Sequence, residues 1–346
     1  MASTNKALIF KKVPNGLPVA GQDLTIENVP NDANTAAPPN GVALQSLYAS
    51  FDPYLRGRMR PAEAKSYTPP FTIGQPISND VIAKVLRSNN KDFKEGDVVQ
   101  GLLDIQQYTV LDGEGVKKIK HLDNPRGIDI RIFLGALGMP GLTAYSSLYK
   151  IGQPKKGETI FVSAASGAVG QVVGQVAKHE GLKVIGSVGS DEKLDYIIKD
   201  LGFDSGFNYK KEKPGDALSR LAPQGIDIYY ENVGGETLDA ALAAMNNHGR
   251  VVACGSISQY NATGERYGVR NMFLVTVKRL LIQGFIVFDA DFGPAYYAEH
   301  QKNVQQWIKD GSFKPITHET DGIDNAIEGF LDLYLGRNKG KAVLKF

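Results

Sequence analysis

The chain has 346 residues, which at roughly 150 residues per domain predicts about two domains with a sizeable buried core. It carries 39 Lys and Arg against 37 Asp and Glu, and this near balance gives no electrostatic case for binding nucleic acid or a membrane surface. The single cysteine, Cys254, excludes a disulfide framework and any zinc site of the CxxC type. A lone cysteine is typical of a protein from a reducing compartment, so we expect this protein to lie in the cytosol.

The start of the chain does not have the pattern of a secretion signal, because small polar residues lead directly into a strand-like run at 7–10. The longest apolar stretches, 272–277 and 285–288, are much shorter than the ~20 residues needed to cross a bilayer. We therefore expect no membrane segment.

The chain changes character near its middle. Residues 1–130 are rich in Pro, Gly and Asn and contain short β-type runs such as 42–48 and 81–86, which predicts a mostly β domain. From about residue 158, strands alternate with amphipathic helices, which predicts parallel strands joined by helical crossovers. The expected strands are 159–163, 183–188, 226–230, 250–254 and 281–287, and the expected helices are 169–179, 191–201, 215–221, 236–245 and 294–309.

The fold class expected from this rhythm is α/β, with a doubly wound parallel-sheet domain over 131–314. The last segment, 315–346, reads as a helix at 323–335 and a strand at 341–346. We expect this tail to return to the first domain and complete it, with the cleft between the two domains.

The strongest local motif is the turn at 160–170, where a buried strand breaks into small residues before a helix. It reads Ala-x-Gly-x-x-Gly, with Ala165 at the first glycine position and Gly167 and Gly170 at the others. Small residues let the backbone approach a pyrophosphate, and the helix N-terminus presents unpaired amides and the positive end of its dipole. The alternative is a tight strand-to-helix turn with no ligand, but the βαβ context favours a dinucleotide.

The end of the next strand decides between the two nicotinamide cofactors. Asp191 lies about 20 residues past the glycines, where an NAD site places an acid on the ribose 2′-hydroxyl. It also reads as part of a helix start, with Ser190 as the cap and Asp191 in the first turn. We prefer the second interpretation because Lys193 then reaches a 2′-phosphate from the same turn. NADPH is the expected cofactor.

Six sequence runs together resemble one family. They are 52–59 (DPYLRGRM), 139–145 (MPGLTAY), 164–170 (AASGAVG), 189–193 (GSDEK), 230–235 (YENVGG) and 254–258 (CGSIS). They resemble the zinc-independent medium-chain dehydrogenases/reductases, in the branch of NADPH-dependent alkenal and enone double-bond reductases that includes prostaglandin reductase (leukotriene B4 12-hydroxydehydrogenase). The resemblance runs from about residue 42 to the end of the chain.

This resemblance implies a GroES-like β domain completed by the C-terminal tail, a Rossmann domain, and a homodimer. It implies that Gly167, Ala168, Val169 and Gly170 line the pyrophosphate and that Lys193 and Tyr209 hold the 2′-phosphate. The other cofactor contacts it implies are Met139, Thr143, Asn232, Cys254, Gly255, Ser256, Ile257, Ser258, Tyr260, Phe285, Ile286, Val287 and Asn338.

Four of these residues have simpler interpretations. Tyr209 also reads as a strand-end aromatic packed on the sheet, and Asn232 and Asn338 as turn residues. Cys254 reads as a small buried hydrophobe and not as a reactive thiol.

The sequence predicts no metal site. With one cysteine and five histidines that occur singly, it lacks the Cys and His set of a zinc alcohol dehydrogenase. A conjugated alkene needs only hydride delivery to carbon and stabilisation of an enolate, so double-bond reduction is the favoured reaction.

The expected reaction transfers hydride from NADPH to the β-carbon of an α,β-unsaturated aldehyde or ketone. Tyr54 and Tyr260 are the candidate catalytic residues, because a phenol with a pKa of about 10 stays protonated at neutral pH and can donate to an enolate. Tyr54 also reads as a packing residue. A quinone reductase, a hydroxy-fatty-acid dehydrogenase and an NADPH-binding protein without turnover remain alternatives.

Overall fold

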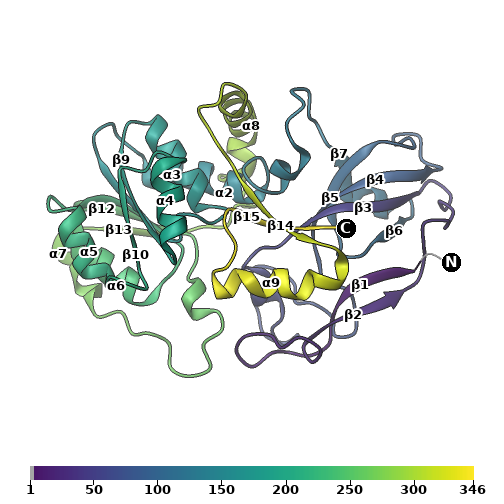
Figure 1. The fold of residues 1–346 in the computed structure, drawn as a ribbon, viewed down its shortest axis with the longest axis horizontal. Helices are drawn as coiled ribbons and strands as arrows, with labels where there is room; N and C mark the ends of the chain where they lie inside the picture. The colour runs from purple at the N-terminus through teal and green to yellow at the C-terminus, as the bar shows by residue number, and fades with distance from the viewer. Residues whose placement is uncertain (1–3) are drawn as a thin grey trace. The chain divides into compact units, whose positions relative to one another are not determined.

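The computed structural model describes residues 4–346, and the chain divides into two compact units. The first unit runs to Leu134 and includes Thr317–Phe346, and the second unit is Gly135–Ile316. The first unit is built on strands, and the second alternates strands with helices (Figure 1). This is the α/β class expected from the sequence.

The first unit contains a seven-stranded sheet in the order β14-β15-β3-β4-β5-β7, with β6 paired to β3, and a separate antiparallel pair β1-β2. The C-terminal strand β15 pairs antiparallel with β3, placing Val343 opposite Ser50. Figure 1 shows this yellow strand among the purple and blue strands of the N-terminal part. The bounds are β1 Asn5–Phe10, β2 Leu24–Val29, β3 Val42–Ser50, β4 Ser78–Ser88, β5 Val98–Asp104, β6 Tyr108–Leu111, β7 Ile119–His121, β14 Thr317–Asp321 and β15 Lys341–Lys345.

The first unit has two α-helices, α1 (Leu55–Arg58) and α9 (Ala326–Leu335), and 3₁₀ turns at Gly115–Lys118, Ile130–Leu134 and Ile323–Asn325. Alternate residues of the strands face one core, which α9 closes. Phe330 of α9 meets Phe51 edge to face, with ring centroids 5.9 Å apart. The tail therefore contributes both a strand and core side chains to this unit.

The second unit contains a six-stranded parallel sheet in the order β10-β9-β8-β11-β12-β13. Numbered within the unit this order is 3-2-1-4-5-6, that of the Rossmann fold. The strands are β8 Thr159–Val162, β9 Lys183–Val188, β10 Ser205–Asn208, β11 Ile226–Glu231, β12 Met245–Ala253 and β13 Leu281–Gly284. The helices are α2 Met139–Ser147, α3 Gly170–His179, α4 Asp191–Lys199, α5 Pro214–Leu221, α6 Gly235–Ala244, α7 Leu274–Lys278 and α8 Gly293–Lys309, with a π-turn at Leu148–Gly152 and 3₁₀ turns at Ile257–Gln259 and Asn271–Phe273.

Three sequence expectations need correction in this unit. The strand expected over 281–287 ends at Gly284, because Phe285 turns aside to stack on Phe292, with centroids 5.1 Å apart. Met245 opens β12 and does not end the preceding helix. The short strand β10 and the helix α2 were not predicted, since neither Ser-Gly-Phe-Asn nor a run opening Met-Pro-Gly has a clear period.

The first unit contains a buried ion pair between Lys341 and Asp52. Lys341 is 1% exposed, and its ammonium group donates to the carbonyls of Phe51 and Ala342 and lies 3.3 Å from the carboxylate of Asp52. Asp52 in turn accepts from Ser50 Oγ and, at 2.8 Å, from Asn79 Nδ2. Every one of these groups has a partner, which is the condition under which a buried pair is tolerated.

Removing the ammonium group should destabilise the first unit strongly. Lys341→Met leaves the Asp52 carboxylate buried without its cation, and we expect the free energy of unfolding to fall by about 3–5 kcal/mol. Lys345→Met is the matched control in the same strand, because its exposed pair with Asp321 should contribute little to stability. Urea unfolding followed by circular dichroism measures both, and equal losses would contradict this account.

Candidate functional site

The second unit reverses its strand order between β8 and β11, the position where open α/β sheets bind ligands beyond the carboxyl ends of the strands. Ser163 and Asn232 follow these two strands directly. The Asn232 amide donates to Ser163 Oγ at 2.9 Å, and Asn232 Nδ2 donates to the Ser163 carbonyl at 2.8 Å. The ends of the two central strands are therefore tied together, and the Asn232 side chain is part of this link as well as of a turn.

The turn after β8 combines close packing with an open helix end. Ala164 adopts a left-handed conformation at φ 48°, and a Cβ added to Gly170 would lie 2.4 Å from the Ala164 carbonyl oxygen. No side chain caps the start of α3 at Val169. The amides of Gln171 and Val172 donate to the carbonyls of Gly167 and Val169, each at 3.0 Å, and the positive end of the helix dipole gives this end the chemistry that favours a phosphate group. Gly167 and Ala168 lie within the same turn.

A second group of predicted residues meets at the end of β9. A Cβ added to Gly189 would lie 2.7 Å from the Tyr209 hydroxyl, so this phenol rests against the backbone just before α4. Ser190 caps α4 by accepting from the Lys193 amide at 3.3 Å. Burial raises the pKa of Tyr209, which keeps its hydroxyl protonated. The structure thus brings Lys193, which is 8% exposed, and Tyr209, which is 45% exposed, to one corner of the sheet.

The interpretation of Asp191 as a first-turn acid is confirmed, since Ser190 is the cap and Asp191 the first residue of α4. Its carboxylate accepts from Asn208 Nδ2 at 2.9 Å and forms an ion pair with Lys211. These two partners hold the pKa of Asp191 below its usual range.

The loop after β12 folds back on the turn after β11. The Ile257 amide donates to the Asn232 carbonyl at 3.1 Å, and the Ser258 hydroxyl donates to the Val233 carbonyl at 2.6 Å. The Ser256 amide donates to the hydroxyl oxygen of Tyr260 at 3.2 Å. A Cβ at Gly255 would approach that oxygen to 2.9 Å, so a larger residue there would displace the Tyr260 hydroxyl. These bonds give the Tyr260 hydroxyl a defined position.

Helix α2 meets the same edge of the sheet through hydroxyl groups. Thr143 Oγ1 donates to the Met139 carbonyl at 2.8 Å, and the Tyr230 hydroxyl lies 2.8 Å from Ser147 Oγ. Cys254 neighbours Tyr230, and burial raises the pKa of its thiol to about 12. Cys254 is partly exposed, and its raised pKa predicts a poorly reactive thiol near the site.

Residues 285–287 form a loop beyond β13. The Gly293 amide donates to the Val287 carbonyl at 2.8 Å, and the Asp289 amide donates to the Ile286 carbonyl at 3.0 Å. This turn leads the chain from β13 into α8.

Tyr54 and Asn338 lie in the first unit. The Tyr54 hydroxyl donates to Asn79 Oδ1 at 2.8 Å, and burial raises its pKa. Asn338 Nδ2 donates to the Gly340 carbonyl at 3.0 Å, within its own turn. Their positions at the cofactor or the substrate remain predictions.

Two site residues were missed from the sequence. Ser163 is the polar residue that ends an otherwise apolar buried strand, a signal that was available. Asn79 is recognisable only from its contacts, because nothing in the sequence pairs it with Tyr54 twenty-five positions away.

Comparison with known proteins agrees with this geometry. Residues 6–119 match a family model described as the N-terminal domain of oxidoreductase, and residues 168–302 match one described as zinc-binding dehydrogenase. The chain is 56% identical over 342 residues to the NADP-dependent oxidoreductase RED1 of Cochliobolus heterostrophus, covering 99% of this chain and 97% of that one. It belongs to the medium-chain dehydrogenase/reductase family.

Two further proteins are similar to this chain over nearly its whole length. A tobacco (Nicotiana tabacum) 2-alkenal reductase (NADP(+)-dependent) is 42% identical over 99% of this chain and 97% of its own length. The crystal structure of CurA in complex with NADPH from Vibrio vulnificus superimposes with a TM-score of 0.88, at 37% identity over 98% of each chain. The resemblance stated from the sequence motifs is confirmed.

Because residues 168–302 of this medium-chain dehydrogenase/reductase match a model described as zinc-binding dehydrogenase, the arrangement of its possible metal ligands is relevant. Within residues 4–346, no three His, Cys, Asp or Glu side chains lie together as a metal-binding group. His300 was expected at a surface or helix end and is instead fully buried, with Nε2 2.8 Å from the Ala136 carbonyl and its pKa lowered to about 4 by burial. Over the same residues, no helix is both long and apolar enough to span a bilayer.

The raised pKa of Cys254 predicts slow alkylation of the native protein. At pH 8 a thiol with a pKa of about 12 is almost entirely protonated, whereas roughly a quarter of the thiols of an exposed cysteine with a pKa of about 8.5 are ionised. We expect iodoacetamide to leave the folded chain unmodified at pH 8 and to modify it fully in guanidinium chloride, as measured by mass spectrometry. Rapid labelling of the native chain would show that the thiol is accessible and ionised.

Proposed function

We propose that the chain reduces the carbon–carbon double bond of α,β-unsaturated aldehydes and ketones with NADPH. The observation that carries this proposal is the defined Tyr260 hydroxyl beside the nucleotide-binding edge of the Rossmann sheet. The 42% identity to a 2-alkenal reductase over nearly the whole chain supports the same reaction. We expect the protein to act in the cytosol.

The second unit has the chemistry to hold NADPH. The start of α3 suits the pyrophosphate, and Lys193 and Tyr209 suit the 2′-phosphate because one is cationic and the other a hydroxyl donor. The remaining predicted contacts are Met139, Thr143, Asn232, Asn338, the loop 254–260 and the segment 285–287. When bound, NADPH supplies the hydride that adds to the β-carbon of the substrate.

The chain's own contribution is to position the substrate and stabilise the enolate oxygen. Because Tyr260 accepts a hydrogen bond from the Ser256 amide, its own O–H is polarised toward an acceptor. The proton of Tyr54 is directed to Asn79 in the structure, so this residue can donate to a substrate only by leaving that partner. We therefore propose Tyr260, whose oxygen is held by the Ser256 amide, and Tyr54 as the two hydroxyl donors to the enolate.

We also propose a homodimer that forms through β13. This strand is the edge of the sheet, and its exposed Leu281 and Ile282 leave an apolar strand edge that pairing would cover.

A substrate panel tests the proposed reaction. We expect 2-alkenals and enones to support oxidation of NADPH in preference to NADH, with no loss on treatment with a chelator. Turnover of quinones or hydroxy-fatty acids instead would favour the other reductase and dehydrogenase reactions. Oxidation of simple alkanols, a requirement for zinc, or binding without turnover would overturn the proposal.

Replacing Tyr260 by Phe tests its role in the chemical step. The variant keeps the ring but loses the donor to the enolate, so we expect kcat to fall about a hundredfold with little change in the affinity for NADPH. Tyr267→Phe is the control, since its amide donates to Gln259 of the same loop at 3.0 Å but its hydroxyl donates to Asp239 at 3.2 Å. Unchanged turnover in Tyr260→Phe would mean that the proton donor is another hydroxyl or water.

Replacing Lys193 by Ala tests the 2′-phosphate site. We expect Kd for NADPH to rise about tenfold or more, because a charge-assisted contact is lost, while Kd for NADH changes little. Lys199→Ala is the control on the same helix, where the lysine pairs with Asp195 on the surface. Equal weakening of NADPH and NADH in a fluorescence titration would refute the role of Lys193.

A further inference from the structure

Asp191 follows the glycine turn at about the spacing at which an acid selects NAD in dinucleotide-binding folds, although here it lies in the first turn of α4, and this chain is proposed to use NADPH. A free carboxylate there would accept the 2′-hydroxyl of NADH and repel the 2′-phosphate of NADPH. In this structure both carboxylate oxygens are engaged. Asn208 Nδ2 donates to Oδ1 at 2.9 Å, and Lys211 Nζ donates to Oδ2.

Both partners of Asp191 come from one turn, at residues 208–211. Asn208 is the last residue of β10 and lies opposite Val188, the last residue of β9, so its side chain starts beside the α4 cap. It is 7% exposed. Its Oδ1 accepts from the Lys210 amide at 3.1 Å, and its carbonyl accepts from the Lys211 amide at 2.9 Å. The turn therefore delivers the Lys211 side chain to Asp191.

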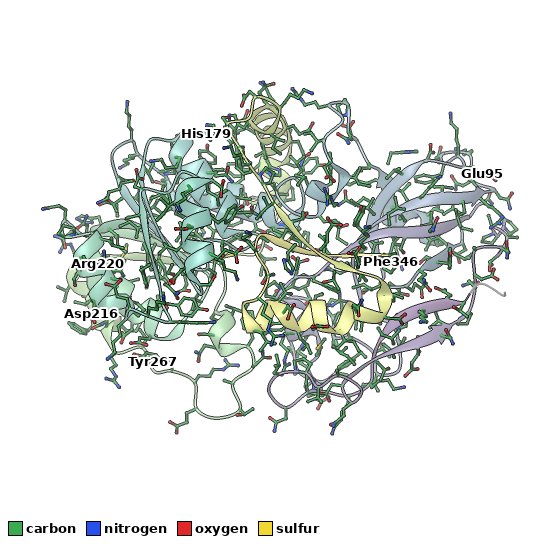
Figure 2. The ribbon with its side chains drawn as sticks, in the orientation of Figure 1. Glu95, His179, Asp216, Arg220, Tyr267 and Phe346 are labelled. Carbon is green, nitrogen blue, oxygen red and sulfur yellow. The ribbon has the colours of Figure 1, made fainter. Side chains whose placement is uncertain are left out.

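The other acid of this turn is neutralised in the same way. Glu212 accepts from Arg220 Nε at 3.0 Å and from Nη2 at 2.6 Å. Arg220 projects from α5, as Figure 2 shows. Each of these two carboxylates thus has its own cation.

We propose that Lys211, aligned by Asn208, determines the preference for NADPH over NADH by binding the Asp191 carboxylate and withholding it from the ribose. This inference rests on the NADPH dependence of the proposed function, but it is independent of the reaction catalysed. The pair is exposed on both sides, so it contributes little to folding and its removal should leave the thermal midpoint unchanged.

The test compares Lys211→Met, Lys210→Met, Asp191→Asn and the Lys211→Met/Asp191→Asn double variant. Lys210→Met is the matched control, since it removes the same charge one position away without freeing Asp191. Kd for NADPH and for NADH is measured by nicotinamide fluorescence at low ionic strength, where surface charges are least screened. Binding, and not turnover, is the readout, so a chain that binds but does not reduce enones still gives a result.

In Lys211→Met we expect the ratio of Kd for NADH to Kd for NADPH to fall about tenfold, the size of a favourable charge contact. Lys210→Met should lower the ratio by less than about threefold, through loss of a more distant charge. Asp191→Asn should raise the ratio, and adding Lys211→Met to it should then cost no more than Lys210→Met, because no carboxylate remains to be released.

Three results would overturn the inference. Equal effects of Lys211→Met and Lys210→Met would reduce the role of Lys211 to general charge. A full tenfold loss in the double variant would mean that Lys211 contacts the phosphate directly and not through Asp191. A wild-type chain that binds both dinucleotides equally would remove the preference that the inference explains.

Discussion

The hydrogen bonds between Ser163 and Asn232 join the carboxyl ends of β8 and β11, the two neighbouring strands between which the strand order of the parallel sheet reverses. A parallel sheet leaves its polar backbone groups at these ends, and helices leave in opposite directions on either side. Because the ends are tied together, the turn after β8 and the turn after β11 are held in register. The loop that carries Tyr260 is then bonded to the second of these turns. The position of the proposed donor hydroxyl thus depends on a link between two main-chain turns.

Charge pairing is the second constraint on the molecule. In the second unit, Asp191 and Glu212 each face a cation across the segment that follows β10. In the first unit, Asp52 and Lys341 form a buried pair whose remaining hydrogen-bonding capacity is taken up by backbone carbonyls, Ser50 and Asn79. The same Asn79 accepts a hydrogen bond from the Tyr54 hydroxyl, so the orientation of that phenol depends on the buried pair of Asp52 and Lys341. Exposed pairs contribute little to stability, and a buried pair is tolerated where every one of its groups has a partner.

Much of the fold could be predicted from the sequence because its long elements have strong periods. The strands at β8, β9, β11 and β12 and the helices α3 to α6 and α8 were found within a few residues of their observed bounds. The short β10 escaped detection because its burial comes from neighbours on the sheet and not from its own alternation. The expected strand beyond Gly284 failed because ring stacking of Phe285 with Phe292 overrides its β-type composition.

By itself, the sequence determined the α/β class, the phosphate-type turn and the candidate residues, because these depend on period, residue size and order along the chain. Only the tertiary structure decided what each candidate touches. It placed the Tyr209 hydroxyl on Gly189, directed the Tyr54 proton to Asn79 and bound Asp191 to Lys211. These contacts join residues 20 to 25 positions apart, and no local pattern records such pairings.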